Sequence, residues 1–277
     1  MTLGRVGIWN RTVAEGRPES AEAAAELEEL GFGAVWIGGS PPVSMAENVL
    51  AATSRLIVGT SILNVWQHEP ADVAAQSNAA NAKFDNRFLL GLGISHGPMV
   101  ANYSKPLATM KAFLAGLDAA GHPREQRLLA ALGPKMLELS AREANGAVPY
   151  LTTAEHTARA RDILGPDRLL VPELKVALTN DHAEGLQLAR EHLQIYLGLP
   201  NYLNSLRTLG FDDADFADGG SDKLVTGTVA IGDEAVVDEW VQRHLDAGAD
   251  HVAIQVVNSP LPRAQWRVLS GLPQLRP

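Results

Sequence analysis

The sequence predicts an α/β fold, a single (β/α)₈ TIM barrel that occupies all 277 residues. Short apolar runs rich in β-branched residues alternate with longer helical patterns, which is typical of βαβ units. The runs are apolar throughout, as expected for parallel strands buried on both faces. Eight such units can be counted, and one barrel domain can reach this length. A doubly wound open sheet remains the alternative, because a count of strands does not exclude it.

The first half of the chain supplies four strand–helix units. The predicted strands are 6–9, 34–37, 56–63 and 88–93, and the predicted helices are 19–30, 46–53, 70–84 and 107–119. Gly31 follows the first helix, and glycine commonly ends helices at that position. Pro70 opens the third helix in its first turn, where proline is favoured.

The second half supplies four more units. The predicted strands are 127–132, 147–151, 169–178 and 252–257, and the predicted helices are 135–143, 154–164, 182–197, 202–209, 234–247 and 263–269. Pro172 interrupts the seventh strand. The acidic, glycine-rich segment 210–232 is predicted to be a mobile loop within the single domain 1–277.

Composition excludes several classes of function. The formal net charge is −9 and no long basic run occurs, so neither nucleic acid nor an anionic membrane is an expected partner. The sequence has no cysteine, which excludes disulfides, thiolate metal sites and a cysteine nucleophile. No apolar stretch is long enough to span a membrane, and residues 1–16 lack the apolar core of a secretory signal. We expect a cytoplasmic protein that acts on a small-molecule substrate.

The active site of a barrel lies at the C-terminal ends of its strands. The residues expected there are mostly neutral and polar, without a carboxylate pair, clustered metal ligands or a nucleophile elbow, so no metal site is predicted. Gly133–Met136 joins the fifth strand directly to a helix. Free N–H groups in such a first turn bind phosphate, and Lys135 adds a positive charge. An ordinary βα turn is the alternative interpretation.

Histidine is the side chain best suited to proton transfer at neutral pH. His96 follows the fourth strand and is the best candidate for that role, with His68 a weaker one. His251 opens the eighth strand at the opposite end of the barrel. The remaining histidines lie on helices or their ends and are expected to be exposed to solvent: His122, His156, His182, His192 and His244.

Five segments together resemble the bacterial luciferase-like family, in particular its actinobacterial branch that uses the deazaflavin coenzyme F420. They are ELEELGFGAVWIGGS, RLIVGTSILN, FDNRFLLGLGISHGP, LLAALGPKMLELSAREANGAVPYL and GDEAVVDEWVQRHLDAGADHVAIQVV. They cover most of the chain in the family's order. GTSILN and LAALGPKML are most similar to the F420-dependent branch, which favours F420 over FMN.

The resemblance implies a cofactor site. Several members carry a non-proline cis peptide bond in the third strand, behind the cofactor ring, and Ser61–Ile62 matches that position. The segment from Gly93 to His96 would run beside the ring and its tail, and Gly133–Met136 would hold the phosphate. The full implied set is Ser61, Ile62, Asn64, Gly93, Ile94, Ser95, His96, Gly133, Pro134, Lys135, Met136, Leu151 and Thr152.

The sequence also departs from the family. One branch has an Asp-His pair after the second strand, where this chain has Gly39 and Ser40, and neither can act as a base. A proposed acid after the fourth strand is replaced by His96. The common β-hairpin insertion between the fourth and fifth strands is absent. These differences make a sugar-phosphate substrate doubtful.

Three hypotheses for function follow from the resemblance. The first is an oxidoreductase that transfers a hydride between F420 and a small organic substrate, with His96 as the catalytic proton donor. The second is an FMN-dependent monooxygenase. The third, from another class, is a deazaflavin- or flavin-binding carrier or sensor without catalysis. The family likeness also predicts a homodimer, and the small residues of 71–82 would permit close contact between helices.

Overall fold

The computed structural model describes residues 3–101 and 103–276. Its strands are β1 (Val6–Trp9), β2 (Ala34–Ile37), β3 (Ile57–Thr60), β4 (Leu63–Asn64), β5 (Phe88–Gly93), β6 (Arg127–Leu129), β7 (Gly146–Ala147), β8 (Leu169–Leu170), β9 (Glu173–Leu178), β10 (Val229–Gly232) and β11 (Val252–Val256). Its longer helices are α1 (Pro18–Glu29), α2 (Val43–Ala52), α3 (Pro70–Lys83), α4 (Pro106–Ala119), α5 (Pro134–Glu143), α6 (Ala154–Leu164), α7 (His182–Leu197), α8 (Pro200–Thr208) and α11 (Glu234–Asp246). Short helices complete the fold at α9 (Asp213–Phe216), α10 (Asp222–Thr228) and α12 (Arg263–Leu269).

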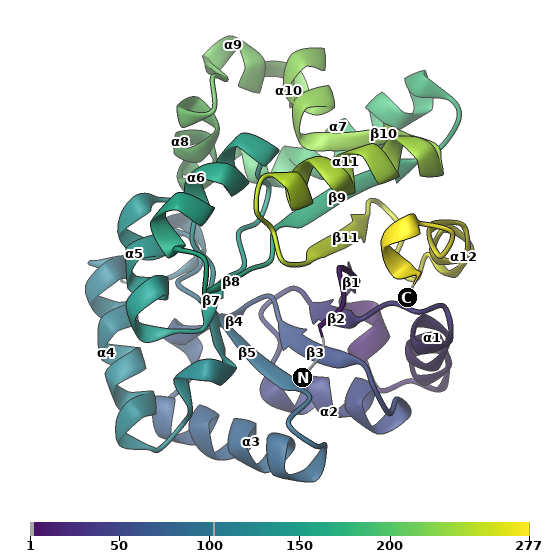
Figure 1. Ribbon diagram of the computed structural model, residues 1–277. Helices are drawn as coiled ribbons and strands as arrows, with labels where there is room; N and C mark the ends of the chain where they lie inside the picture. The colour runs from purple at the N-terminus through teal and green to yellow at the C-terminus, as the bar shows by residue number, and fades with distance from the viewer. Residues whose placement is uncertain (1–2, 102, 277) are drawn as a thin grey trace.

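The strands pair in parallel, in the order β10-β9-β11-β1-β2-β3-β5-β6-β7-β8, with β4 also paired to β5. The last barrel strand, β11, lies beside the first, β1, as in a TIM barrel (Figure 1). The two ends of the path also meet, because β8 and β9 are halves of one strand interrupted at Pro172. The Glu173 N–H donates to Pro149 O after β7 at 3.0 Å, and Ala253 N–H donates to Pro172 O at 3.0 Å. The predicted barrel is confirmed, and the doubly wound alternative is excluded.

Side chains fill the interior of the barrel toward the N-terminal ends of its strands. Trp36 lies across β3, where Gly59 leaves room for its ring: a Cβ at position 59 would be 2.4 Å from that ring. The Trp36 Nε1 atom donates to His251 Nε2 at 3.1 Å, and His251 Nδ1 bonds Gly4 O at 2.9 Å. His251 therefore lies at the end of the barrel away from the expected active site, as its position in the sequence predicts.

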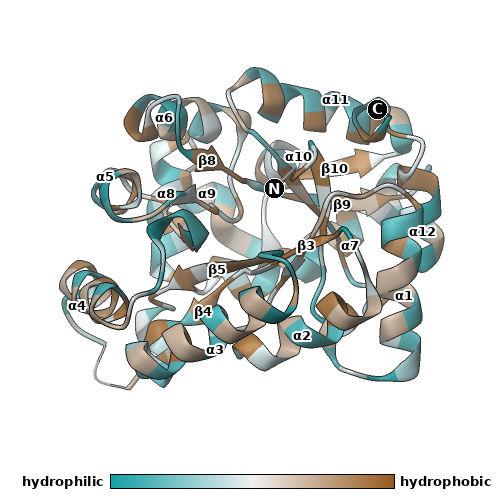
Figure 2. Cartoon of the chain, turned by 60° about the horizontal axis from the view of Figure 1, so that its bottom comes forward, coloured by the Kyte–Doolittle hydropathy of each residue, from teal (hydrophilic) through white to brown (hydrophobic). Residues whose placement is uncertain are grey.

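A second apolar layer lies between the strands and the surrounding helices, and it contains Leu27, Val49 and Leu90. Figure 2 shows this arrangement as hydrophobic strands enclosed by helices whose faces alternate between hydrophobic and hydrophilic. The core therefore holds each strand between two packed layers, as the continuous apolar runs predict. Within residues 3–101 and 103–276, every helix is too short or too polar to cross a membrane.

The segment 210–232 differs from its prediction as a loop. It contains α9, α10 and β10, and β10 pairs with the outer part of β9 from Val229↔Lys175 to Gly232↔Leu178. The acidic residues that suggested a loop act as helix caps: Asp212 forms a capping box with Asp215 at α9. Composition predicted a loop here because capping residues and loop residues are the same types.

Other boundaries changed less. The predicted strand 56–63 is split into β3 and β4. Of the predicted strand 147–151, only Ala147 lies in a strand, because β7 ends there. Within residues 94–101 and 103–126, no strand lies between β5 and β6, so the expected absence of a hairpin insertion holds for the described part of that connection. The homodimer through residues 71–82 stays a prediction.

Three helix-associated histidines are buried, although the sequence suggested that they are exposed. His122, His156 and His244 have at most 4 % of their surface accessible. His122 bonds the Ser77 hydroxyl at 2.7 Å, and His244 bonds the Thr157 hydroxyl at 2.9 Å. The His156 Nε2 atom bonds Leu132 O at 2.9 Å. Each ring therefore has a hydrogen-bond partner on a neighbouring element, which compensates for its removal from water.

Buried histidine rings make the stability of the fold depend on pH. Burial lowers the pKa of His122, His244 and His251 to about 4. The unfolded chain then binds more protons than the folded one between pH 6.5 and about 4, so the free energy of unfolding falls as pH falls through this window. Each pKa unit corresponds to about 1.4 kcal/mol. Urea unfolding between pH 7.5 and 5 measures the slope.

The variant His244→Gln should flatten that slope, because it removes one of the buried rings. The control His182→Gln changes an exposed histidine and should leave the slope as it is. An unfolding free energy that stays constant from pH 7 to 5 would contradict the assignment of these rings as neutral in the folded state.

Candidate functional site

The C-terminal ends of β1 and β3 meet at the mouth of the barrel. The peptide bond between Ser61 and Ile62 is cis, as the resemblance implies. The Trp9 Nε1 atom donates to Ser61 Oγ at 3.1 Å, which joins the two strand ends. A Cβ at Gly93 would be 2.4 Å from the Ile62 side chain. The absence of a side chain at Gly93 therefore provides space for Ile62. This packing requirement is separate from the role beside the cofactor ring that the resemblance implies for Gly93.

The loops after β4 and β5 are fixed to one another. Asn64 Oδ1 accepts from the Trp66 N–H at 3.2 Å, and Trp66 Nε1 donates to Ile94 O at 2.7 Å. The predicted cofactor residue Asn64 is buried, and its carbonyl oxygen caps the short helix that follows it. Ser95 adopts a positive φ of 56°, which turns the chain toward His96.

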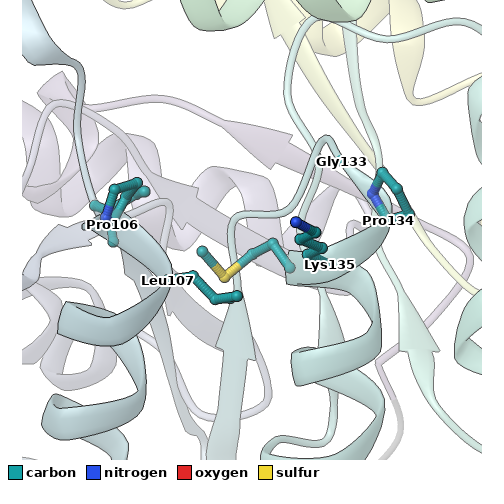
Figure 3. A pocket seen from close by; sticks show the side chains of 7 residues that line it. Pro106, Leu107, Gly133, Pro134 and Lys135 are labelled. Carbon is teal, nitrogen blue, oxygen red and sulfur yellow. The ribbon is translucent and has the colours of Figure 1, made fainter. Parts of the chain in front are cut away.

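A pocket of about 370 Å³ lies between α4 and α5, next to the end of β5. Figure 3 shows Pro106 and Leu107 on one side and Gly133, Pro134 and Lys135 on the other. Ile94 and Met136 complete its lining. The structure thus brings five of the predicted cofactor residues together in this pocket: Ile94 and the four residues of the turn Gly133–Met136.

The amino terminus of α5 opens into this pocket without a capping side chain. Its N-cap residue is Gly133, and a Cβ built there would meet nothing within 4 Å. Helix amino termini carry unsatisfied N–H groups and a partial positive charge. Together with the exposed Lys135, this open turn has the donors and the space that a phosphate group requires. The residues present therefore fit the phosphate-bearing tail of a cofactor.

Leu151 and Thr152 follow β7 but do not line this pocket. Leu151 is buried with a φ of 53°, and its N–H donates to Glu173 Oε2 at 3.1 Å. Thr152 is also buried, and its Oγ1 has no hydrogen-bond partner. These two members of the implied cofactor set therefore lie outside the pocket that the turn Gly133–Met136 lines.

The predicted catalytic residue His96 packs against an aromatic ring of α8. The centroids of the His96 and Tyr202 rings are 4.9 Å apart. Burial lowers the pKa of His96, so the ring is neutral at pH 7, with one nitrogen as donor and the other as acceptor. Its Nδ1 atom is buried without a partner, which leaves it available to a bound molecule.

An ion pair lies inside the barrel wall at the start of β9. Lys175 Nζ is 2.8 Å from both carboxylate oxygens of Glu173, and neither side chain is exposed. The ammonium group also lies 3.6 Å from the centroid of the Tyr150 ring and 5.0 Å from that of Tyr196. Burial lowers the pKa of Lys175 to about 8 and raises that of Glu173, and each partner opposes the change in the other.

Three tyrosines surround this pair. The Tyr150 hydroxyl is 2.6 Å from the Tyr196 hydroxyl and donates to Gln255 Oε1 at 2.7 Å. Burial raises the pKa of Tyr196 to about 12 and the pKa values of Tyr150 and Tyr202 well above the ordinary value, so all three stay protonated. We call the following residues the mouth cluster: His96, Tyr150, Glu173, Lys175, His192, Tyr196, Tyr202 and Gln255.

Most of the mouth cluster was missed by the sequence analysis. A signal was present, because Glu173 and Lys175 interrupt an otherwise apolar strand at positions that share one face. Two opposite charges in a strand buried on both faces indicate a buried pair. The tyrosines on α7 and α8 could not be placed, because their helices reach the mouth only through tertiary packing.

The position of the family's Asp-His pair has no acid or base. Gly39 has a φ of 75° and Ser40 a φ of 60°, so the chain turns sharply after β2. Arg11 donates to Gly39 O at 3.2 Å across this turn. Among the described residues, no group of acids and histidines has the arrangement of a metal site.

Comparison with known proteins agrees with this geometry. Residues 1–119 match the family model described as luciferase-like monooxygenase. The matched part runs from β1 to the end of α4. A comparison with curated proteins finds no match.

Solved structures share this luciferase-like fold over almost the entire chain. One is an F420-dependent secondary alcohol dehydrogenase in complex with an F420–acetone adduct (TM-score 0.76, 11 % identity, 99 % of each chain). Another is the coenzyme F420-dependent tetrahydromethanopterin reductase from Methanopyrus kandleri (TM-score 0.77, 13 % identity, 98 % of each chain). A third is the oxygenating constituent of 3,6-diketocamphane monooxygenase from Pseudomonas putida with FMN (TM-score 0.70, 12 % identity, 98 % of this chain and 97 % of that one). At these identities the likeness establishes the fold.

The buried pair gives a test of the site's construction. Lys175→Met leaves Glu173 without its partner inside the barrel, and removing one member of a buried pair costs about 3–5 kcal/mol. The control Lys83→Met removes an exposed pair with Glu47 and should cost at most about 1 kcal/mol. Urea unfolding measures both. Equal losses for the two variants would show that the buried pair has no special structural role.

Proposed function

We propose that this chain is an oxidoreductase that binds coenzyme F420 at the barrel mouth and transfers a hydride between it and a small organic substrate. The observation that carries the proposal is the uncapped amino terminus of α5, which opens into a pocket beside the end of β5. The luciferase-like match and the F420-dependent proteins of the same fold support it.

The chain's own residues would divide the work. The backbone N–H groups of Gly133 and Lys135 and the Lys135 ammonium would hold a phosphate. Ile94 and Leu107 would cover the apolar part of the tail in the pocket. Ile62 and Trp9 would support the ring at the mouth. When bound, the deazaflavin supplies the hydride chemistry.

His96 is the proposed proton donor and acceptor. Its unpartnered Nδ1 atom lies at the mouth, and its packing on Tyr202 holds the ring in one orientation. The neutral ring can take a proton from an alcohol as its hydride leaves, and in the reverse direction the protonated ring would return that proton to the alkoxide. The tyrosines stay protonated and can only donate or accept hydrogen bonds.

FMN is the second candidate cofactor, supported by the FMN complex of a monooxygenase with the same fold. An FMN-bound protein would be a monooxygenase. Gly39 and Ser40 support the third candidate, a carrier or sensor without catalysis. They occupy a position where one branch of the family has an acid-base pair, and neither can act as an acid or base.

Titration of the protein with F420 and with FMN, followed by cofactor fluorescence, tests the proposal. We expect saturable binding of F420 and at least tenfold weaker binding of FMN. Tighter binding of FMN than of F420 would identify FMN as the cofactor. Binding of neither cofactor would overturn the proposed function. F420 binding without turnover over a panel of reductants and acceptors would favour the carrier.

A substitution at Gly133 tests the phosphate site directly. Asp is a good N-cap residue, and Gly133 has an ordinary φ of −100° with open space around it, so Gly133→Asp should fold. Its carboxylate would occupy the free N–H groups and repel a phosphate, which should weaken F420 binding at least tenfold. The control Gly133→Ala adds a side chain without charge and should bind nearly as the parent does. Unchanged F420 binding by Gly133→Asp would show that the phosphate does not bind at this turn.

The role of His96 is tested by His96→Ala. F420 binding should persist, and single-turnover hydride transfer should slow about a hundredfold, as expected when a general acid-base group is lost. The control His182→Ala changes an exposed histidine on α7. Equal rates of hydride transfer in the two variants would show that His96 has no role in proton transfer.

A further inference from the structure

The peptide unit between Leu132 and Gly133 leads into the turn that opens the pocket between α4 and α5. Residues 131 and 132 follow β6 and precede α5, and they belong to no strand or helix. Within the described part of the chain, the one hydrogen bond to these two residues comes from His156, whose Nε2 atom lies 2.9 Å from Leu132 O. The orientation of this peptide unit therefore depends on the His156 ring.

His156 is fixed in the first turn of α6. Thr153 is the N-cap residue of this helix, and its hydroxyl oxygen accepts from the His156 N–H. The His156 side chain is buried. Burial shields its hydrogen bond from water, which strengthens the link between α6 and the Leu132 carbonyl.

The direction of this hydrogen bond follows from the chemistry of its two atoms. A carbonyl oxygen only accepts, so His156 Nε2 carries the proton that it donates to Leu132 O. Burial lowers the pKa of His156, the bond to Leu132 O opposes this change, and the charge of Arg159 adds to it, so the ring is neutral at pH 7. A neutral imidazole has a single N–H. The Nδ1 atom is left with a lone pair, and it has no partner among the described residues.

The Leu132 carbonyl and the Gly133 N–H belong to one planar peptide unit. Among the described residues the only cis peptide bond is Ser61–Ile62, so this unit is trans. In a trans unit the C=O and N–H bonds lie in one plane and point in opposite directions. Since His156 holds the carbonyl oxygen toward α6, the Gly133 N–H points away from α6.

The side away from α6 is the side of the pocket. Helices α4, α5 and α6 follow one another around the barrel (Figure 1), and the pocket lies between α4 and α5. Gly133 lines the pocket opposite Pro106 and Leu107 (Figure 3). No group in residues 3–101 or 103–276 accepts from the Gly133 N–H, so this donor is free for a ligand. The His156 bond and the free donor thus lie at the two ends of one rigid unit.

We propose that His156 is a positioning residue, which holds the Leu132–Gly133 peptide so that the Gly133 N–H points at the phosphate of the bound cofactor. His156 does not contact the phosphate itself. Without the Nε2 proton, no other hydrogen bond opposes rotation of the peptide unit, and rotation turns the Gly133 N–H out of the pocket. This inference rests on the proposed function for the identity of the phosphate-bearing molecule.

The first test uses the unaltered protein with ¹⁵N-labelled histidine. A phosphate that accepts from the Gly133 N–H polarises the peptide and makes Leu132 O a stronger acceptor. The NMR signal of the His156 Nε2 proton should therefore move downfield as F420 saturates the protein. The control is the Nδ1 proton of His251, which is bonded to Gly4 O at the opposite end of the barrel and should not move. An unmoved His156 signal at saturation would overturn the proposal.

Two substitutions separate the donor from the bulk of the ring. His156→Phe keeps an aromatic ring without the donor and should weaken F420 binding at least tenfold. His156→Gln offers an amide N–H in place of the imidazole N–H and should bind F420 within threefold of the parent. The control His244→Phe makes the same change at a buried ring that bonds Thr157, and should bind as the parent does. Parent-like binding by His156→Phe, or equal losses in His156→Phe and His156→Gln, would refute the role of the donor. If His156→Phe does not fold, the NMR titration decides.

Inorganic phosphate separates this proposal from the proposed function. If the protein binds neither F420 nor FMN, the proposed function falls, and the same His156 signal is followed during titration with inorganic phosphate. A saturable downfield movement would then keep the positioning role of His156 for another phosphate-bearing ligand, and no movement would overturn that role too. F420 binding with an unmoved His156 signal would keep the proposed function and remove His156 from the phosphate site.

Discussion

Glu173 and Lys175 form a fully buried ion pair in the wall of the barrel, and the architecture of the mouth depends on it. The carboxylate bonds the Leu151 N–H, which holds the loop after β7. The ammonium group holds the Tyr150 and Tyr196 rings, and through them the helices α7 and α8. Desolvating two charges is expensive, so such a pair contributes little net stability and is better understood as fixing one arrangement of its surroundings.

The pair lies beside the point where the barrel closes. Pro172 has no N–H to donate and interrupts the strand between the segments β8 and β9. The chain uses this interruption to change partners: β8 pairs with β7, while β9 pairs with β11 and β10. Glu173 is the first residue after the change. A polar side chain is tolerated in the wall here because the break brings Leu151 close enough to bond it.

The sequence predicted the fold better than the site. Strands such as 88–93 and helices such as 154–164 agree with the structure to the residue, because apolar periodicity and caps are local properties. The segment 210–232 was misjudged because its acidic residues cap short helices. The turn Gly133–Met136 could be recognised as an open helix terminus, since a glycine cap is visible in the sequence. The tyrosines of the mouth cluster could not be recognised from the sequence. They are far apart along the chain and come together only after α7 and α8 pack.

The filling of the barrel from its N-terminal end has a consequence for water. Trp36, His251 and Gly4 form a hydrogen-bonded plug beneath the mouth, and the rings of Trp36 and His251 are fully buried. Both ring nitrogens of His251 and the indole N–H of Trp36 are already hydrogen-bonded within this plug, so its rings offer no free polar group to relay a proton. A proton consumed or released at the mouth would therefore be exchanged with bulk water on the mouth side of the barrel. Under the proposed function, substrate and proton would then enter and leave from the same side of the molecule.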